Sequence, residues 1–458
     1  MLAELIKSGV DVFRLNFSHG EHKAHAEVIK SIHTLNKELE TNVAILADLQ
    51  GPKIRIGKVE PKDGTGKIFL KKGDKIIFTT NKGINKPNHY YISYRTFAVD
   101  IEISHRILVD DGKLELKVLH SNSLDKVELE VMNDAYLSSN KGVNLPDTEI
   151  SIPSITEKDS KDLEFILTQK VSWIALSFVR SSKDITKLRG LLEVKQHPAK
   201  IIAKVEKPEA VDNIEAIIDE SDAVMVARGD LGVELPVEQT PVIQKQIVAK
   251  CIAKSKPVII ATQMMDSMID DPVPTRAEVS DVANAIFDGA DAVMLSGETA
   301  VGKHPLRVVR AMRRIIAQVE KESVIYNKKH TLNKDSKTFL SDAICNTVCD
   351  LVHEVNAAGI IGMTKSGYTA FALSSRRPNA NIFVFTENED LLNQVSLIWG
   401  VRAFFYNNFS STDNTIFDVQ SILKTKGYLK SKDIVLNTGS MPIEKRGATN
   451  TLKVTVIK

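Results

Sequence analysis

Residues 200–230 read KIIAKVEKPEAVDNIEAIIDESDAVMVARGD and contain two short apolar runs separated by a helix-like segment. Each run leads to a carboxylate, Glu206 after the first and Asp230 after the second. Lys204 and Arg228 lie two positions before these carboxylates. Side chains two residues apart point to the same face of a strand, so each run delivers one cation and one carboxylate to one place. Hard oxygen ligands beside positive charge suit a magnesium ion that holds an anionic, phosphorylated substrate.

The same kind of apolar run, ending in polar residues or glycine, recurs elsewhere in the chain. The further examples are VFRLNF (12–17), VAILAD (43–48), WIALSFV (173–179), VIIATQ (258–263) and AVMLSG (292–297). Continuous apolar runs that alternate with helices predict βα units and a parallel sheet buried on both faces. We therefore expect an α/β fold of the (β/α)8 TIM-barrel type. Only seven of its strands are visible, and we expect the first strand to be missing, because the chain opens directly in a helix. Either this chain begins late, or the barrel is completed in some unusual way.

The stretch between Asp48 and Trp173 is too long for a loop. Its middle alternates in strand fashion around glycine turns, as in GKIFLKKGDKIIFTT and HRILVDDGKLELKVL, and predicts a small inserted β-barrel domain. A polar stretch, YNKKHTLNKDSKT, then leads to a further set of strands and helices. The expected domains are a barrel split into residues 1–54 and 151–328, an insert at 55–150 and a C-terminal α/β domain at 338–458.

The composition is that of an ordinary globular protein with about two or three domains. A net charge of +2 over 458 residues gives no reason to expect nucleic acid as a partner. No apolar run approaches the roughly 18 residues that span a membrane, and the start lacks a signal-peptide layout. Cys251, Cys345 and Cys349 form no disulfide framework, and we expect buried thiols rather than a metal clip. This cysteine usage predicts a reducing, cytoplasmic location.

In a (β/α)8 enzyme, the active site lies at the carboxyl ends of the strands. Six of the predicted strands carry polar groups there, namely Arg14, Asn16 and Ser18; Asp48; Lys204 and Glu206; Arg228, Gly229 and Asp230; Thr262 and Gln263; Ser296 and Glu298. Any one of them alone would be explained by a salt bridge or a helix cap. Polar groups at six strand ends indicate a binding site, because their burial is costly unless they meet ligands or each other.

These residues closely resemble the motifs of the pyruvate kinase family. The matching segments are RLNFSHG, DLQGPKIR, KGVNLPD, IIAKVEKPEAV, VARGDLGVELP, ATQMMDSM and DVANAIFDGADAVMLSGETA. The resemblance covers nearly the whole chain, including the insert and the C-terminal unit. It implies transfer of the phosphoryl group of phosphoenolpyruvate to ADP, giving pyruvate and ATP, which is the last step of glycolysis.

The resemblance also implies roles for individual residues. Lys204, Arg14 and Thr262 are expected to be catalytic. Glu206 and Asp230 are expected to hold Mg²⁺ or Mn²⁺, which would also bind the substrate. The implied substrate contacts are Arg14, Lys204, Thr262 and the backbone N–H groups of Gly229 and Asp230.

A monovalent-cation site is implied at Asn16, Ser18, Asp48 and the carbonyl of Leu49. This chain has Lys53 where many family members have glutamate. A fixed ammonium there can supply the charge that potassium otherwise brings, so we expect K⁺ to be dispensable. The alternative is that Lys53 only pairs with Asp48 and that potassium is still required.

Family positions around ADP correspond to Arg55, His19, Asp111 and Lys141, with Lys141 arriving as the insert closes over the site. His19 could equally be an ordinary surface histidine. In the C-terminal unit, TKSGYTA resembles the family's allosteric sugar-phosphate site, with a second loop at 439–450. The implied contacts are Thr364, Lys365, Ser366, Gly367 and Thr369, and the effector could be a sugar phosphate or a nucleotide. The alternative for this segment is a simple helix cap and turn. A homotetramer is implied by resemblance only.

Two other functions remain open from the sequence. A magnesium-dependent barrel lyase or aldolase that acts through an enolate would share the carboxylate pair. A catalytically impaired, truncated scaffold would share the fold. The joint presence of Lys204, Glu206, Asp230 and Thr262 favours an active enzyme.

Overall fold

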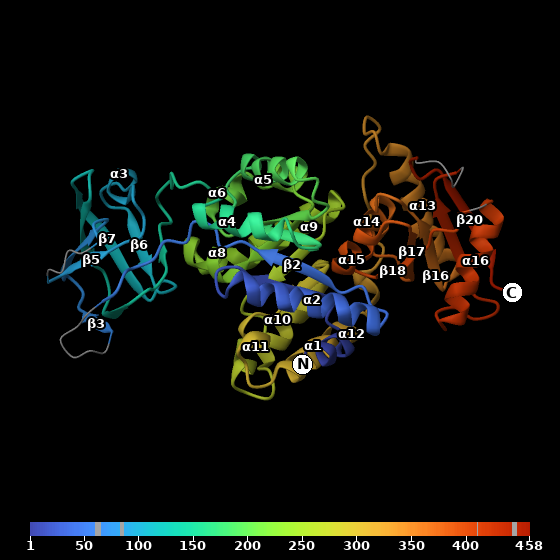
Figure 1. The fold of residues 1–458 in the computed structure, drawn as a ribbon, viewed down its shortest axis with the longest axis horizontal. Helices are drawn as coiled ribbons and strands as arrows, with labels where there is room; N and C mark the ends of the chain where they lie inside the picture. Colours follow the sequence, from blue (N-terminus) through green and yellow to red (C-terminus); the bar gives the residue numbers. More distant parts are fainter. Residues whose placement is uncertain (60–65, 83–86, 410, 442–446) are drawn as a thin grey trace.

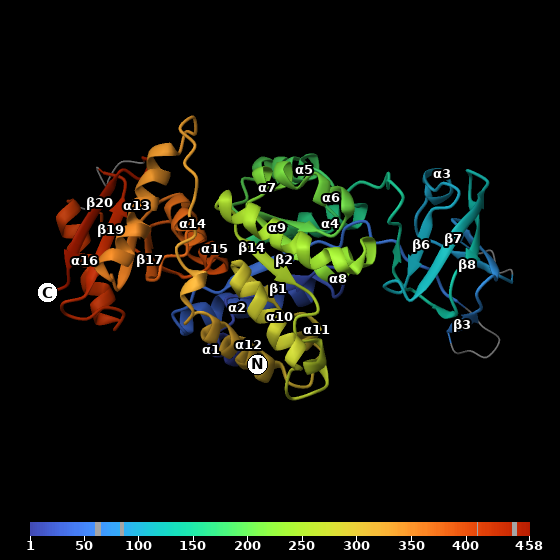
Figure 2. The same ribbon diagram turned by 180° about the vertical axis from the view of Figure 1, so that it is seen from behind.

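The computed structural model describes residues 1–458 except 60–65, 83–86, 410 and 442–446. The described chain forms an elongated molecule in which three units follow one another along the long axis (Figure 1). An inserted β unit lies at one end, a barrel unit in the middle and a C-terminal unit at the other end. The view from behind shows the same order (Figure 2).

The barrel unit is built on one parallel sheet with the order β1-β2-β11-β12-β13-β14-β15. Its strands are β1 Val12–Asn16, β2 Ala44–Asp48, β11 Trp173–Leu176, β12 Lys200–Val205, β13 Ala223–Ala227, β14 Val258–Ala261 and β15 Ala292–Met294. Each predicted apolar run forms one of these strands, and they follow one another in sequence order. The predicted fold class, a barrel with seven visible strands, an inserted β domain and a C-terminal α/β domain, is confirmed.

The register brings the two key carboxylates to the ends of neighbouring strands, with Glu206 directly after β12 and Asp230 in the helix that follows β13. Lys204 of β12 lies opposite Met225 of β13, and Val205 lies opposite Val226. Glu206 therefore leaves the sheet beside the strand that leads to Asp230. A separation of one βα step in sequence has become direct adjacency in space.

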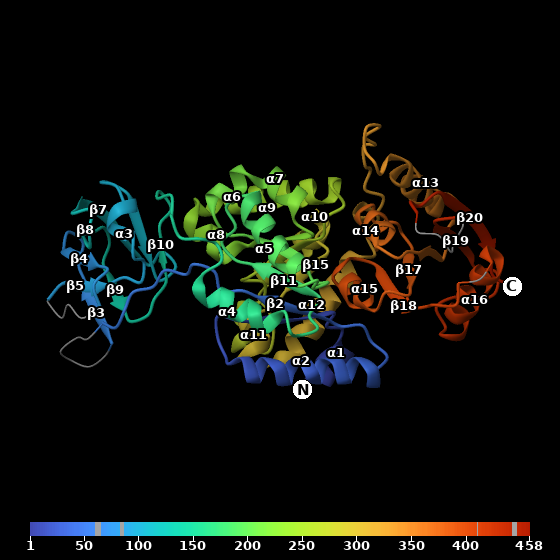
Figure 3. The same cartoon turned by 45° about the horizontal axis from the view of Figure 1, so that its top comes forward.

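Helices surround this sheet, and one of them, α8, lies at the end that faces the lid (Figure 3). They are α1 Leu2–Ser8, α2 His22–Glu38, α4 Glu157–Ile166, α5 Ser182–Val194, α6 Pro208–Asp212, α7 Ile214–Glu220, α8 Arg228–Glu234, α9 Thr240–Ala253, α10 Arg276–Asp288, α11 Gly297–Ala300 and α12 Pro305–Val319. Short 3₁₀ helices lie at η1 Val237–Gln239, η2 Asp266–Ile269 and η3 Ser323–Ile325. None of the described helices combines the length and apolar character needed to cross a membrane.

Helix α10 shows how local sequence fixes these elements. It begins at a capping box in which the Thr275 side chain accepts from the backbone of Glu278 and the Glu278 side chain accepts from the backbone of Thr275. It ends at Gly289, whose φ of 103° is a conformation that favours glycine. Both signals are readable in the sequence, and together they fix where the chain turns into β15.

The sheet is open between its two edge strands. Among the described residues, no strand pairs β1 with β15. A cavity of about 2320 Å³ lies on this side and is lined by both strands, by α12 and by part of the C-terminal unit. We call it the open-side cavity.

The inserted unit has its own hydrophobic core. A six-stranded sheet has the order β10-β6-β7-β8-β4-β5, and a two-stranded sheet pairs β3 with β9. The elements are β3 Lys67–Leu70, β4 Lys75–Thr79, β5 His89–Tyr91, α3 Phe97–Asp100, β6 Arg106–Val109, β7 Leu114–Ser121, β8 Lys126–Val131, β9 Ala135–Ser138 and β10 Val143–Asn144. We call this unit the lid.

The chain enters and leaves the lid at one place. Val143 N–H donates to the carbonyl of Ile54 at 3.0 Å, and an isolated bridge joins Arg55 to Gly142. Strands β2 and β11, which precede and follow the lid in sequence, pair directly in the barrel sheet. The insertion therefore leaves the path of the barrel strands unchanged.

The C-terminal unit is a five-stranded sheet with the order β18-β17-β16-β19-β20, in which only β20 is antiparallel to its neighbour. Its elements are α13 Phe339–Val355, β16 Gly359–Met363, α14 Tyr368–Ser375, β17 Asn381–Thr386, α15 Glu389–Gln394, η4 Val395–Leu397, β18 Val401–Phe405, α16 Thr412–Thr425, β19 Ile434–Gly439 and β20 Thr451–Val456. Apolar clusters cover both of its faces. Cys345 and Cys349 are buried in this unit, and Cys251 is buried in the barrel.

The C-terminal unit docks on the barrel at the amino ends of the strands. Leu397 joins an apolar cluster with Trp173 and other inward-facing barrel residues. The indole N–H of Trp173 donates to the carbonyl of Gln394 at 3.2 Å. Arg377 pairs with Asp291 at 3.0 Å, and its guanidinium carbon lies 5.0 Å from the ring centroid of Trp399. This end of the barrel is closed by packing, which leaves the opposite end for the site.

Candidate active site

Lys204 lies at the centre of a cluster of charged groups. Its Nζ lies 2.8 Å from Glu206 Oε1 and 3.3 Å from Asp48 Oδ1, and it donates to Ser177 Oγ at 2.7 Å. Arg14 Nε donates to the other oxygen of Asp48, Oδ2, at 2.6 Å. These residues lie on, or directly after, the neighbouring strands β1, β2, β11 and β12. We call these five residues the charge cluster.

The charge cluster is almost completely shielded from water. The exposed fraction of the side chain is 10% for Lys204 and 1% for both Asp48 and Glu206. Burial alone would lower the pKa of Lys204, but the Asp48 and Glu206 carboxylates outweigh it, and the pKa is raised. Lys204 is therefore a fixed ammonium at neutral pH. Because a buried ion pair loses much of its Coulomb energy to desolvation, this cluster points to function more than to stability.

Glu206 is held in an unfavourable state. Burial raises the pKa of its carboxyl, the Lys204 ammonium lowers it, and the Asp230 carboxylate raises it again, with a raised pKa as the net result. Its Oε2 accepts from the backbone N–H of Phe178 at 2.7 Å. Phe178 has a positive φ of 54°, a strained conformation of the kind that clusters at functional sites.

The pair Glu206 and Asp230 fits a divalent cation. The two carboxylates lie close enough for Asp230 to raise the pKa of Glu206, and like charges so placed are stabilised by a cation between them. Their oxygens are the hard donors that Mg²⁺ and Mn²⁺ prefer. Among the described residues, no cluster of three or more His, Cys, Asp or Glu side chains is placed for a metal. The remaining ligands would therefore come from substrate and water.

Thr262 lies beside the start of helix α8. Its hydroxyl oxygen accepts from the backbone N–H of Gly229 at 2.7 Å, and the hydroxyl donates to the carbonyl of Ala261 at 2.6 Å. Thr262 and Gln263 have positive φ values of 67° and 53°. Two such residues in succession cost about 1–3 kcal/mol each, so the surrounding structure must hold this turn in place.

Arg228 serves this turn rather than the charge cluster. Its guanidinium pairs with Asp281 at 2.6 Å and donates to the carbonyl of Thr262 at 2.9 Å. The two cations singled out in the sequence therefore separate: Lys204 meets the carboxylates of the cluster, and Arg228 positions a loop.

The last strand end also has a bracing role. Glu298 is 1% exposed, and its carboxylate accepts from the backbone N–H groups of Met265 at 3.1 Å and Ser296 at 2.7 Å. These bonds connect the loops that follow β14 and β15. Glu298 and Ser296 therefore hold the rim of the site in this structure.

The residues expected to form a monovalent-cation site lie together at the ends of β1 and β2. Asn16 Oδ1 accepts from the backbone N–H of Ser18 at 3.0 Å. The carbonyl of Leu49 accepts from Ser177 Oγ at 2.7 Å. Asp48 pairs with residues of the charge cluster, and within the described chain no ion pair or hydrogen bond joins it to Lys53.

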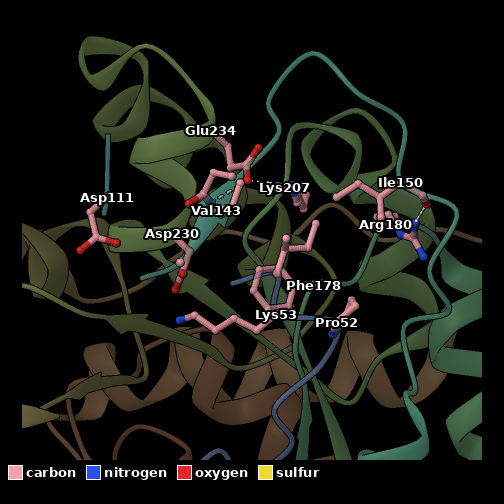
Figure 4. Close-up of a pocket in the computed structure, with 13 residues that line it drawn as sticks. Pro52, Lys53, Asp111, Val143, Ile150, Phe178, Arg180, Lys207, Asp230 and Glu234 are labelled. Carbon is pink, nitrogen blue, oxygen red and sulfur yellow. Dashed lines mark hydrogen bonds and ion pairs between the residues drawn. The ribbon is translucent and has the colours of Figure 1, made fainter. Parts of the chain in front are cut away.

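Lys53 instead faces a small cavity of about 30 Å³ between the lid and the barrel (Figure 4). It extends across this cavity towards Asp230, and Asp111 of the lid lies on the same wall. The lining residues are Pro52, Lys53, Ile54, Asp111, Gly142, Val143, Asn144, Ile150, Phe178, Arg180, Lys207, Asp230 and Glu234. We call it the lid pocket.

The other residues expected at the nucleotide lie outside the lid pocket. Arg55 donates to the carbonyl of Asn140 at 3.0 Å. Lys141 pairs with Asp110 at 2.8 Å and is 41% exposed. His19 is exposed, and its carbonyl lies 3.0 Å from the His25 ring nitrogen. The structure therefore gathers Arg55, Asp111 and Lys141 near the junction of lid and barrel, while His19 stays at the surface.

The segment expected to bind an effector forms the start of α14. Thr364 Oγ1 accepts from the N–H of Gly367 at 3.0 Å, Lys365 pairs with Glu387 at 2.8 Å, and Thr369 bonds Thr449 at 2.6 Å. Ser366 Oγ accepts from the backbone N–H of Tyr368 at 3.4 Å. Of the second loop, 439–450, residues 442–446 lie outside the described part of the chain.

Sequence reasoning missed several residues of the site. Ser177 directly follows β11, the barrel strand that contributes none of the six sets of polar groups singled out in the sequence. Lys207, Glu234 and Asn144 lie in the lid pocket, and Lys207 stands directly beside Glu206. Its position next to a predicted ligand was the signal that could have found it.

Comparison with known proteins places these observations in one family. The family model described as the pyruvate kinase barrel domain matches residues 1–309, and the model of the pyruvate kinase alpha/beta domain matches residues 342–455. The chain is 41% identical to pyruvate kinase 2 of Synechocystis sp. and 40% identical to the pyruvate kinase of Geobacillus stearothermophilus, in each case over 100% of this chain and 77% of the relative. The crystal structure of a pyruvate kinase from Cryptosporidium parvum superposes with a TM-score of 0.90 at 33% identity, covering 100% of this chain and 93% of that one.

Proposed function

Because the chain belongs to the pyruvate kinase family, it transfers the phosphoryl group of phosphoenolpyruvate to ADP, and we propose that the charge cluster around Lys204 carries out this transfer. One observation carries the proposal: the buried Lys204 ammonium lies between the Asp48 and Glu206 carboxylates. Phosphoryl transfer requires positioning and charge neutralisation rather than covalent chemistry. A fixed cation in a site with little water supplies that neutralisation.

Lys204 and Arg14 would act on the transferring group. Because its pKa is raised, Lys204 remains charged and stabilises the phosphoryl group and the enolate without giving up its proton. Arg14 uses Nε to bind Asp48, which leaves its two terminal nitrogens to grip phosphate oxygens. Both residues therefore serve as positive charges and not as general acids.

Glu206 and Asp230 would hold Mg²⁺, or Mn²⁺ in its place. When bound, the ion supplies positive charge at the substrate's carboxylate and enol oxygen. Glu206 contributes an ionised carboxylate, and Phe178 N–H fixes the direction of its second oxygen. Lys53, which extends towards Asp230 across the lid pocket, adds a further positive charge on that side.

Thr262 would organise protonation of the enolate. Its hydroxyl already donates to the carbonyl of Ala261, so a proton would reach the substrate through water held at this hydroxyl rather than from the hydroxyl itself. Gly229 N–H is engaged by Thr262 Oγ1. A substrate carboxylate bound at Gly229 and Asp230 would therefore share or displace this bond.

Lys53 would make potassium dispensable. The site expected for K⁺ is formed by Asn16, Ser18, Asp48 and the Leu49 carbonyl, and Lys53 is not tied to Asp48 in the described chain. Its ammonium is therefore free to supply charge to the substrate. Initial rates with potassium replaced by tetramethylammonium should be nearly unchanged, and a large loss of activity would show that K⁺ is required.

ADP and ATP would bind between the lid and the barrel, at Arg55, Asp111 and Lys141, with His19 as a further contact. We also propose a cytoplasmic homotetramer. A sugar phosphate or a nucleotide would regulate it at Thr364, Lys365, Ser366, Gly367 and Thr369.

The substitution Lys204→Met tests the proposal. Turnover is expected to fall by on the order of 10³-fold, because a preorganised cation at the developing charge is removed. Binding of Mn²⁺, followed by electron paramagnetic resonance, should persist, since Glu206 and Asp230 remain. Lys200→Met, at the other end of the same strand, is the matched control and should retain most activity. Near-normal turnover of Lys204→Met would contradict the assignment.

Pyruvate formation from phosphoenolpyruvate should depend strictly on ADP. Pyruvate release without ADP would indicate a lyase acting through an enolate. No pyruvate under either condition would indicate an impaired scaffold.

A further inference from the structure

A buried polar contact joins the lid to helix α8 in the lid pocket. Asn144, on strand β10 of the lid, donates from Nδ2 to Glu234 Oε1 at 2.8 Å. Glu234 ends α8, and the same oxygen lies 2.6 Å from the Nζ of Lys207. Figure 4 shows Lys207 and Glu234 on the wall of the pocket beside Asp230. None of these three residues belongs to the charge cluster.

Glu234 and Lys207 tie α8 to the end of β12. Lys207 follows Glu206 directly, and α8 carries Asp230 in its first turn. The exposed fraction of the side chain is 0% for Glu234 and 6% for Lys207. The ion pair therefore links the two segments that carry the carboxylates proposed to hold the metal.

The Glu234 carboxylate can accept more hydrogen bonds than its barrel partners donate. Its Oε2 is buried and has no hydrogen-bond partner among the residues that the structure describes. A buried carboxylate that lacks partners is destabilised, so each donor that reaches it counts strongly. Asn144 is the donor that the lid supplies, and its amide comes from a unit with a separate hydrophobic core.

The lid otherwise has few ties to the barrel at this point. Arg180 donates to the backbone carbonyls of Ile150 and Ile152, where the chain leaves the lid. These bonds fix the hinge segment and not the position of the lid above α8. The Asn144 bond is placed to fix that position.

We propose that Asn144 is a latch: its hydrogen bond to the Glu234–Lys207 pair holds the lid over α8 and so positions the nucleotide-binding side of the site. Asn144 is not among the residues proposed to meet substrate or metal, and it would act as a positioning residue. The inference rests on the function proposed above, because Asp111 and Lys141 of the lid are the residues expected to meet ADP. Loss of the latch should therefore weaken the binding of ADP. The binding of the metal and of phosphoenolpyruvate, which contact barrel residues, should be unaffected.

The position of the lid can be measured without nucleotide. Leu124 in the lid and Val194 in the barrel are 76% and 80% exposed, and the native cysteines are buried, so Leu124→Cys and Val194→Cys accept spin labels selectively. In this background, Asn144→Ala should shift the distance distribution to longer and broader values in double electron–electron resonance. Asn144→Gln, which keeps the amide, should restore much of the parent distribution.

Asn81→Ala is the matched control. Asn81 donates to Asp125 at 2.8 Å within the lid and forms no hydrogen bond or ion pair with the described part of the barrel. It should leave the distance distribution unchanged. For Asn144→Ala, we expect the KM for ADP to rise by about tenfold, as for loss of one hydrogen bond to a charged group. The KM for phosphoenolpyruvate and the Mn²⁺ affinity should stay close to those of the parent.

The outcomes separate the latch from the assignment of the nucleotide site. An unchanged distance distribution in Asn144→Ala would overturn the latch. If the binding of ADP, phosphoenolpyruvate and Mn²⁺ weakened equally, the latch would also be overturned, because such a result would indicate general disruption of the barrel. A longer distance with an unchanged KM for ADP would support the latch and contradict the proposed roles of Asp111 and Lys141.

Discussion

The two ends of the barrel are held in opposite ways. At the amino ends of the strands, Leu397 and Trp173 pack together, and the C-terminal unit closes the barrel mainly with apolar surface, supplemented by the buried Arg377–Asp291 pair. At the carboxyl ends, charged groups such as Lys204 and Glu206 are buried beside one another, and the lid contacts α8 through single polar bonds such as that of Asn144. Packing stabilises the first end, whereas the burial of charged groups at the second end costs stability.

This difference indicates where motion and chemistry can be located. A packed apolar junction resists displacement, because every shift opens voids between close-packed atoms. A junction made of a few hydrogen bonds can break and re-form with little change in buried area. The lid end therefore suits a device that opens for each turnover, and the other end suits a fixed support.

The largest expected effect lies at the charged end. Glu206→Gln should lower turnover by on the order of 10³-fold and abolish tight Mn²⁺ binding, because it removes one of the two carboxylates proposed to hold the metal. In the parent protein, Mn²⁺ affinity should rise with pH, since the pKa of Glu206 is raised and the ion binds the ionised form. Glu209→Gln, in the adjacent α6, is the control. Retained Mn²⁺ binding in Glu206→Gln would show that the metal lies elsewhere.

At the apolar end, substitutions should affect stability more than turnover. Leu397→Ala should lower the free energy of unfolding by about 2–5 kcal/mol, because it leaves a cavity in a core cluster. The measurement is denaturant unfolding, together with kcat under conditions where the variant stays folded. Leu340→Ala, at a side chain that is 70% exposed, should cost little. A large loss of kcat in Leu397→Ala under conditions where the variant stays folded would contradict this difference between the two ends.

A smaller effect is expected at Asp11, on the wall of the open-side cavity. Asp11 faces that cavity, and protein atoms surround its carboxyl on most sides. This partial removal from bulk water raises the pKa of Asp11 to about 6, although Arg402 and Arg313 act to lower it. The folded chain then binds this proton more tightly than the unfolded chain, so stability falls as pH rises from 3.8 to about 6. Asp11→Asn should therefore raise Tm relative to the parent at pH 7.5 more than at pH 4. After allowance for solvent screening, we expect less than about 1 kcal/mol. An equal Tm difference at both pH values would contradict the shift.

The smallest effect is expected at an exposed bond between the C-terminal unit and the barrel. Lys426 lies 3.2 Å from Glu40, with side chains that are 43% and 79% exposed. Lys426→Ala should change the free energy of unfolding by less than about 0.5 kcal/mol, because water and salt screen such pairs. A change of several kcal/mol in denaturant unfolding would mean that polar contacts, and not packing, hold this junction.

Much of the fold could be predicted from the sequence because its parallel strands are buried on both faces and read as continuous apolar runs. The adjacency of Glu206 and Asp230 followed from one βα step. The ion-pair partners of the site's charged residues could not be predicted from the sequence, because they are distant from one another in the chain. Asp48 pairs with Arg14 and Lys204 rather than with Lys53.

The contact between Asn144 and Glu234 spans 90 positions and two separate cores. No local periodicity encodes such a bond. The same limit applies to the positive φ values of Thr262 and Gln263, since neither residue type favours that conformation and the surrounding structure imposes it.

The way the chain enters and leaves the lid has a consequence for how such proteins can be rebuilt. The Ile54 carbonyl meets Val143 N–H, and β2 pairs directly with β11, so the barrel does not depend on the insert for its register. The lid is therefore a separate unit inserted into one connection between two βα units. Exchanging it for the lid of a relative, or for a short turn, should alter the surroundings of the site and leave the strand order and register of the barrel unchanged.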